Sequence, residues 1–181
     1  MTRHTSSLLT GVSTLFLAGL LTVSLHAADK PASAFAELKA AQGQTVSGKL
    51  EFIQEAGAVH VSGDVQHLSP GKHGMHVHDK ADLSAPDLAS AGGHFNPTKE
   101  QHGAPDAEHH HTGDFGNITA DENGTAHVDL TIPGLSLTGA NSIIGHSIII
   151  HGGTDDLKSQ PAGNSGPRVA GGVIEASASS Q

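Results

Sequence analysis

Histidine is the residue type that most sets this chain apart. The sequence holds 15 histidines among 181 residues, and it holds no cysteine. His76 and His78 flank Val77 in a stretch with strand texture. Residues two apart on a strand face the same side, so both imidazoles can reach one ion. Imidazole suits copper and zinc, and without thiolates any metal site must use imidazole and carboxylate.

Five further candidate ligands follow along the chain: His94, His102, His111, Asp114 and His151. The first four lie between residues 79 and 116, a stretch rich in Gly, Pro and Asp with little apolar periodicity. A loop of this length in a compact domain is usually functional. Within it, His109, His110 and His111 are consecutive, a pattern that is also typical of a solvated tract that binds metals loosely.

Short strands must position these side chains. In most of the segments given below, apolar residues alternate with polar or small ones, which is the period of half-buried strands. Residues 143–150 are instead a nearly continuous β-branched run. The predicted strands are 46–52, 59–65, 73–78, 115–119, 126–132, 143–150 and 168–175. The sequence Asp121-Glu122-Asn123-Gly124 predicts a hairpin turn. With no long amphipathic helix and two long loops, the chain is predicted to be all-β, an antiparallel β-sandwich or flattened barrel.

The N-terminus has the texture of an export signal. Arg3 precedes an apolar run, Leu8 to Leu25, that contains no acid and is followed by small residues. We predict a signal peptide over residues 1–27, cleaved after Ala27 or Ala28. The alternative is an uncleaved membrane anchor, because about 18 apolar residues is the lower limit for a span. The rest is predicted as an irregular lead-in (28–44), one domain (45–176) and a disordered tail (177–181).

The overall charge is acidic. The formal net charge is −9 at pH 7, which argues against binding nucleic acid, because phosphates would be repelled. An anionic substrate would depend on local positive charge. An exported domain of this size can bury an adequate core without disulfides, so the lack of cysteine is compatible with export.

The order and spacing of these residues resemble the copper–zinc superoxide dismutase family over about residues 45–175. The matching segments are 74–78, 93–97, 102–105, 111–117, 149–151 and 166–174. The resemblance implies a Greek-key barrel of about eight strands with two long functional loops. It also implies dismutation of superoxide to oxygen and hydrogen peroxide by a redox-cycling copper next to a structural zinc.

The resemblance assigns the ligands residue by residue. It implies copper ligands His76, His78, His94 and His151. It implies zinc ligands His94, His102, His111 and Asp114, so that the His94 imidazolate bridges both metals. The other histidines are interpreted as solvated or satisfied structural residues: His60, His67, His73, His109, His110, His127 and His146.

Two further residues match supporting roles in the family. Arg168 matches the arginine beside the copper, where a fixed guanidinium attracts an anion. Asp155 matches the aspartate that accepts hydrogen bonds from one copper and one zinc histidine, although Asp156 is an adjacent competitor. The loop from 152 to 167 resembles the family's guiding loop, and Lys158 is its only base.

The chain departs from the family where an intramolecular disulfide is usual. Leu88 and Gly171 occupy the two matching positions. Such a bridge contributes on the order of 4 kcal/mol in the chain-entropy model. Leu88 could instead pack apolar surface, which contributes roughly 1.5–3 kcal/mol when a side chain is fully buried. Our hypothesis is that metal binding substitutes for the bridge, because a ligand that binds only the folded state stabilises that state.

The sequence leaves a second class of function open, a non-enzymatic protein that buffers copper or zinc on the same fold. A copper-only variant is disfavoured because His102, His111 and Asp114 are all present. We expect superoxide as the small-molecule substrate, no nucleic acid partner and no stable membrane insertion after signal cleavage. A periplasmic or secreted location is also expected, and the resemblance leaves the oligomeric state open between a homodimer and a monomer.

Overall fold

The computed structural model describes Met1, residues 32–139 and residues 141–178. Most of the predicted signal peptide and the last three residues of the predicted tail lie outside this part. The short 3₁₀ helix η1 (Ala89–Ala91) lies in a loop. The strands are β1 (Ser33–Ala40), β2 (Ser47–Glu55), β3 (Ala58–Gln66), β4 (Gly71–His78), β5 (Asp114–Ala120), β6 (Ala126–Pro133), β7 (Ser147–His151), β8 (Arg168–Val173) and β9 (Glu175–Ala176).

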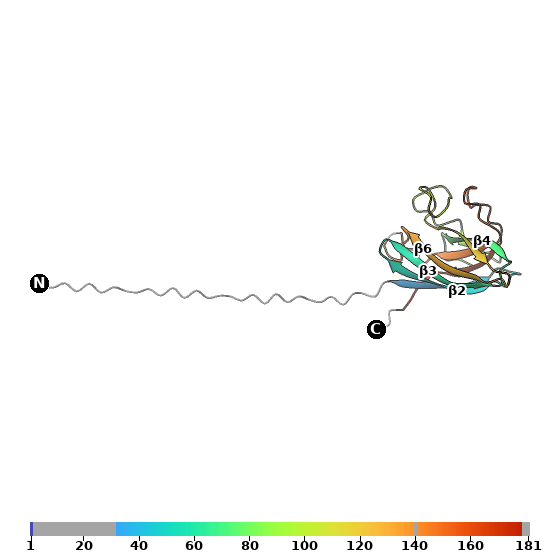
Figure 1. Ribbon diagram of the computed structural model, residues 1–181, viewed down its shortest axis with the longest axis horizontal. Helices are drawn as coiled ribbons and strands as arrows, with labels where there is room; N and C mark the ends of the chain where they lie inside the picture. Colours follow the sequence, from blue (N-terminus) through green and yellow to red (C-terminus); the bar gives the residue numbers. More distant parts are fainter. Residues whose placement is uncertain (2–31, 140, 179–181) are drawn as a thin grey trace.

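The strands pair antiparallel throughout, in the order β5-β4-β7-β8-β1-β2-β3-β6, and β9 pairs with β1. Neighbours that are distant in the sequence, such as β3 with β6 and β4 with β7, give the Greek-key connections. The strands curl around a common core, as Figure 1 shows. The prediction of an all-β Greek-key flattened barrel is confirmed.

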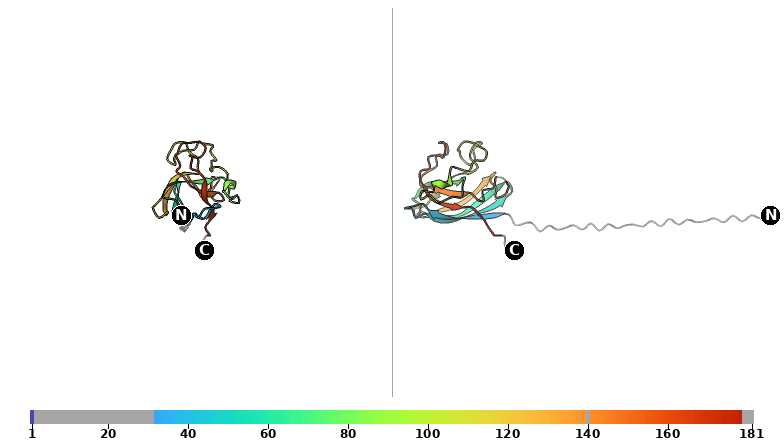
Figure 2. Two further views of the ribbon diagram at one scale, coloured as in Figure 1. Left: turned by 90° about the vertical axis from the view of Figure 1, so that its right-hand side faces the viewer. Right: turned by 180° about the vertical axis from the view of Figure 1, so that it is seen from behind.

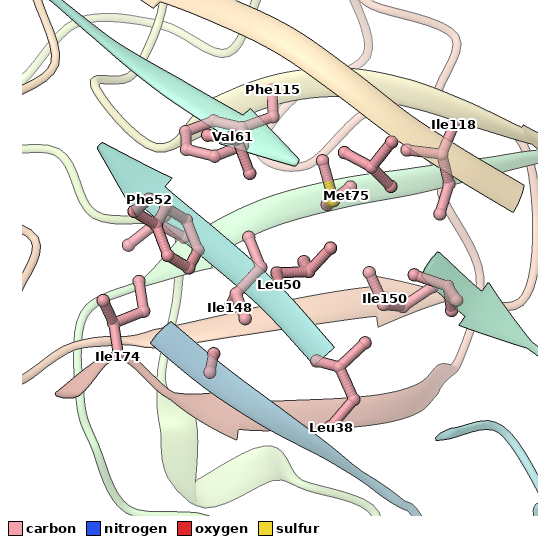
Figure 3. Packing of buried hydrophobic residues seen from close by; sticks show 14 of the residues in the cluster. Leu38, Leu50, Phe52, Val61, Met75, Phe115, Ile118, Ile148, Ile150 and Ile174 are labelled. Atoms are coloured by element: carbon pink, nitrogen blue, oxygen red, sulfur yellow. The ribbon is translucent and has the colours of Figure 1, made fainter. Parts of the chain in front are cut away.

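The interior is built from aliphatic side chains that alternate with outward-facing residues along each strand. On β4, Met75 and Val77 are fully buried, and they face the core together with Ile148 and Ile150 of β7. Figure 3 shows side chains from several strands meeting there, among them Leu50, Phe52, Phe115 and Ile174. Because Met75 and Val77 point inward, His76 between them and His78 after them point out of the barrel.

The prediction of an irregular lead-in before residue 45 is wrong, because Ser33–Ala40 forms β1. Ala34, Ala36 and Leu38 alternate into the core, but alanine carries a weak apolar signal and disfavours strands. Pairing with β2 and β8 overrides that propensity. The predicted disordered tail also begins too early, since the N–H of Ser177 donates to the carbonyl of Ser33 at 2.8 Å.

Two predicted strands are shorter than the apolar pattern indicated. Residues 143–146 form a turn before β7, in which Gly145 has a φ of 86°. Ile143 lies in this turn and its side chain is buried. A β-branched residue therefore occurs here although the segment is not a strand. The predicted strand 168–175 divides into β8 and β9 at Ile174. The N–H of Ile174 donates to the carbonyl of His146 at 2.9 Å, outside both strands.

Two long loops leave the barrel on the same side, as Figures 1 and 2 show. The first connects β4 to β5 and contains η1, and the second connects β7 to β8. Because β4, β7 and β8 are adjacent, the two loops cover the outer face of the same part of the sheet. In the described part of the chain no helix has the length and apolar character to span a membrane.

Candidate metal centre

Three histidines lie on the outer face of the sheet, beneath the two loops. His76 and His78 alternate with the core residues of β4, and His151 ends the neighbouring strand β7. All three are at most 5% exposed. The first loop adds His94, which forms an isolated bridge with His78 and whose side chain is 2% exposed. Four imidazoles thus meet at a buried point outside the apolar core.

The predicted ligands form two groups that could each hold a metal ion. In each group the potential ligand atoms lie within 4.8 Å of one another. The first group is His76, His78, His94 and His151, and the second is His94, His102, His111 and Asp114. All seven residues that the sequence singled out are therefore brought together, and His94 belongs to both groups.

The first group presents four buried ring nitrogens with no hydrogen-bond partner among the described residues: His76 Nδ1, His78 Nε2, His94 Nε2 and His151 Nε2. Buried polar atoms are normally hydrogen-bonded, so four orphaned atoms together need a ligand. The opposite nitrogens are held. Nδ1 of His78 donates to the carbonyl of Gly92 at 2.9 Å, and Nδ1 of His151 donates to that of Gly166 at 3.1 Å. The free nitrogens therefore carry lone pairs, as copper coordination requires.

Burial keeps three of these imidazoles neutral, those of His78, His94 and His151. It lowers the pKa of His78 to about 2, and the neighbouring His94 ring lowers it further. Burial also lowers the pKa of His151 to about 3 and that of His94 to about 4. A metal binds the neutral form of histidine, so the apolar surroundings prepare this group for a cation.

The second group converges on one carboxylate oxygen. Oδ1 of Asp114 lies 2.7 Å from Nδ1 of His94, 2.9 Å from Nδ1 of His102 and 3.3 Å from Nδ1 of His111. Oδ2 accepts the N–H of Gly103 at 3.1 Å and that of His111 at 2.8 Å. Burial raises the pKa of Asp114, but the histidine hydrogen bonds outweigh it and hold the pKa far below its usual value. Three imidazole nitrogens and one ionised carboxylate form a donor set that fits zinc.

Asp155 connects the two groups. Oδ2 accepts from Nε2 of His76 at 2.7 Å, and Oδ1 accepts from Nε2 of His102 at 2.9 Å. Burial lowers the pKa of His102, but hydrogen bonds to Asp114 and Asp155 prevail and raise the pKa to about 9. The adjacent Asp156 instead accepts backbone N–H groups of its own loop. The two hydrogen bonds to Asp155 fix the orientation of the His76 and His102 rings, because a hydrogen bond at one ring nitrogen sets the tautomer.

Two residues near Asp155 have roles that the sequence reasoning missed. The carboxamide of Asn117 exchanges hydrogen bonds of 2.8 and 2.9 Å with the backbone of Asp155. Gly163 has a φ of 65°, and a Cβ there would lie 1.8 Å from Oδ1 of Asp155. The loop can thus approach the carboxylate this closely only with glycine at that position.

Arg168 is held beside the first group by the β4–β5 loop. Its guanidinium donates to the carbonyls of Leu88 and Gly92. The Gly92 carbonyl also accepts from Nδ1 of His78, so one backbone oxygen orients both the arginine and a candidate ligand. Arg168 is part-buried. Its remaining donors give an anion a fixed positive target near the imidazoles.

An apolar cluster occupies the place of the family's disulfide. Leu88 is 5% exposed and packs with Ala41, Ala91 and Ile149, and Leu83 covers the cluster. At Gly171 a Cβ would lie 2.7 Å from Cδ1 of Ile149 and 3.3 Å from Cδ1 of Leu88. Leucine methyls therefore fill the space beside Gly171, and burial of apolar surface takes the place of a covalent link.

The remaining histidines lie outside both groups. His60 and His127 bond to Asp129 and Asp64 across β3 and β6, at 2.7 and 2.6 Å. His73 is buried at 2% exposure, with Nδ1 2.9 Å from the carbonyl of His151. Sequence reasoning gave His73 no role beyond a structural one, and it is the residue that supports the backbone of a candidate ligand.

Residues 46–174 of the chain match the family model of copper/zinc superoxide dismutase. An extracellular superoxide dismutase [Cu-Zn] of Brugia pahangi is 41% identical over 158 residues, which cover 82% of this chain and 78% of that protein. The crystal structure of the clock protein EA4 superposes with a TM-score of 0.74 at 40% identity, covering 83% of this chain and 98% of that one.

Proposed function

Since the chain belongs to the copper/zinc superoxide dismutase family, we propose that it catalyses the dismutation of superoxide to oxygen and hydrogen peroxide. The family's cofactors, copper and zinc, match the two histidine groups in donor chemistry. The observation that carries the proposal is the set of four buried, unpartnered nitrogens next to a carboxylate-centred group, with His94 common to both.

We assign copper to the group of His76, His78, His94 and His151, and zinc to the group of His94, His102, His111 and Asp114. When bound, copper supplies one-electron redox chemistry and zinc supplies positive charge without redox chemistry. An all-imidazole group suits the first ion, and a group with one carboxylate suits the second. Two superoxide ions and two protons give one oxygen and one hydrogen peroxide, so the site must also handle protons.

His94 is the residue placed to hold a proton in this reaction. Its Nδ1 faces Asp114 at 2.7 Å, while Nε2 is buried without a partner and faces the first group. Burial lowers the pKa of His94 to about 4, so the ring is neutral at neutral pH and Nε2 can offer a lone pair to a proton. We propose that Nε2 takes a proton in one half of the cycle and releases it to peroxide in the other.

Arg168 is the residue proposed to position superoxide. Its guanidinium is fixed by two carbonyl oxygens, so it loses little freedom when an anion arrives. A cavity of about 330 Å³ lies beside His151 and is lined by residues 160–162 and 164–166 of the β7–β8 loop. On a chain with a net charge of −9, this local positive charge supports recognition of an anion.

The test is the rate of superoxide decay in the presence of protein loaded with copper and zinc. Wild-type protein should accelerate decay, and His76→Ala should abolish the acceleration because it removes one of four imidazoles. His127→Ala is the matched control, since that side chain is 79% exposed and bonds only to Asp64 among the described residues. Equal decay with the wild type and His76→Ala would eliminate the enzymatic proposal.

The alternative, a protein that only buffers copper or zinc, predicts tight metal binding without accelerated decay. It gives no reason for an arginine fixed beside the first group or for a ligand common to both groups. The same assay separates the two proposals, because buffering needs the ligands but not Arg168. A variant Arg168→Ala that binds both metals but loses most of its activity would favour the enzyme.

We also propose that the protein acts outside the cytoplasm, in the periplasm or after secretion. The apolar N-terminal run and the extracellular superoxide dismutase among its relatives support export. Detection of a mature chain without residues 1–27 in the exported fraction would test it. The resemblance leaves a homodimer and a monomer open, and sedimentation at working concentrations would distinguish them.

A further inference from the structure

Gln160 contacts a candidate zinc ligand in a way that the family resemblance did not indicate. Its Oε1 accepts the backbone N–H of His102 at 2.9 Å, and its Nε2 donates to the backbone carbonyl of the same residue at 2.9 Å. One carboxamide thus satisfies both backbone groups of one residue, as a neighbouring strand would.

His102 needs such a partner because it lies outside any strand or helix. The residue is only 3% exposed, so water cannot freely solvate its backbone. Its ring is already fixed by Asp114 at Nδ1 and by Asp155 at Nε2, each at 2.9 Å. The backbone bonds to Gln160 complete this arrangement, since a ring is aimed correctly only if the Cα that carries it is also held.

The two partners come from different loops. His102 lies in the β4–β5 loop, and Gln160 lies 58 residues later in the β7–β8 loop. Asp155 and Gln160 therefore connect the same two loops through different atoms of His102, one through the ring and the other through the backbone. In a chain without cysteine, such non-covalent links are the means available to hold one loop against the other.

We propose that Gln160 is a positioning residue for the second metal group, which holds the backbone of His102 so that its Nδ1 stays aimed at the metal. The inference rests on the proposed function only in assigning zinc to that group. Partners that orient a metal ligand typically change metal affinity by about 10- to 100-fold when removed. Loss of the carboxamide should therefore speed metal release from this group by about 10-fold.

The experiment measures cobalt(II) in place of zinc, because tetrahedral cobalt absorbs visible light and needs no superoxide. The probe is cobalt alone, and release into a chelator is followed by stopped-flow absorbance of the full chain. Gln160→Ala removes both hydrogen bonds to His102, together with a longer bond of 3.2 Å from Nε2 to the carbonyl of Lys158. Gln160→Glu keeps an acceptor for the His102 N–H but places a carboxylate oxygen against the carbonyl, so it should release cobalt at least as fast.

Gln66→Ala is the matched control, because it truncates an exposed glutamine on β3, away from both loops. Its cobalt release should equal that of the wild type. Cobalt release about 10-fold faster from Gln160→Ala than from the wild type, with unchanged thermal stability of the metal-free protein, supports positioning. Unchanged cobalt release in Gln160→Ala and Gln160→Glu overturns the inference. A Gln160→Ala variant whose metal-free protein is less stable but whose cobalt release is unchanged overturns it as well. Failure of wild-type protein to give a tetrahedral cobalt spectrum overturns it together with the zinc assignment.

Discussion

Truncation of Leu88 tests whether apolar packing stands in for the missing disulfide. The side chain is 5% exposed and packs on Ile149 and Leu83 beside two alanines. Leucine-to-alanine changes in cores cost about 2–5 kcal/mol. Because this cluster is small, we expect Leu88→Ala to cost about 2–3 kcal/mol of the free energy of unfolding.

The backbone at this position adds a second, opposite effect. Leu88 has a φ of 60° and a ψ of 17°, in the left-handed region, where a Cβ costs about 1–2 kcal/mol. Leu88→Gly removes that cost along with the side chain. We therefore expect the glycine variant to be more stable than Leu88→Ala by about 1 kcal/mol, whereas in a regular helix or strand alanine is the more stable of the two.

The assay is equilibrium urea unfolding of the metal-free protein, with Leu88→Met as a volume-conserving control that should cost less than about 1.5 kcal/mol. A second measurement is superoxide decay at saturating metal. The Leu88 carbonyl accepts from Arg168, so Leu88→Ala should also lower activity several-fold. A loss below about 0.5 kcal/mol, the range of ordinary surface changes, would refute the claim that this cluster stabilises the loop.

Three further predictions concern the metal centre. Gly163→Ala should speed cobalt release by about 10-fold or more, because its Cβ would lie 1.8 Å from the Asp155 carboxylate. The control is Gly145→Ala, where φ is 86° and the new Cβ would meet open space. Equal cobalt release from the two variants would count against the clash. The carboxamide of Asp155→Asn cannot accept hydrogen bonds from both His76 and His102, so equilibrium cobalt titration should show an affinity about 10- to 100-fold lower. Unaltered cobalt affinity would contradict a role for Asp155 in orienting these rings. Metal should stabilise the fold by about 4 kcal/mol when its free concentration is 1,000 times Kd, which calorimetry would detect; identical melting temperatures with and without metal would disprove the coupling.

Most of the barrel could be predicted because the alternation of apolar residues matches the sheet directly. Val59, Val61 and Val65 are all buried on β3, as their spacing indicated. The failures occurred where residue type and environment disagree. Ala34 and Ala36 look indifferent in the sequence, but they pair with Phe52 and Leu50 of β2 and belong to the buried core. Ile143 looks like a strand residue but lies in a turn.

The spacing of His76 and His78 on a strand indicated a metal-binding pair, whereas the full set of candidate ligands was implied only by the resemblance to the family. His76 and His78 face one side of β4, and the long loop brings His94 and His102 to them. The supporting contacts could not be predicted in this way. Gln160 is an ordinary polar residue in a polar loop, and its contact with His102 depends on how two loops meet in space. Local sequence carries no signal for such a pairing.

The structure adds to the hypothesis that metal binding substitutes for the disulfide. The apolar cluster around Leu88 and the hydrogen bonds of Asp155 and Gln160 are formed by the chain itself. Part of the loop's stability therefore precedes metal binding, and the ions add to a scaffold that already orients their ligands. Metal-free protein should accordingly be folded, with weaker loop contacts than the loaded protein.

The central claim is that His94 belongs to two metal sites at once, through Nδ1 and Nε2. The most direct test is the copper(II) electron paramagnetic resonance signal with either zinc or cobalt in the second group. Cobalt is paramagnetic, so an imidazolate shared through His94 should couple the two ions and suppress the copper signal that zinc leaves intact. A copper signal of equal intensity with zinc and with cobalt would contradict a shared histidine.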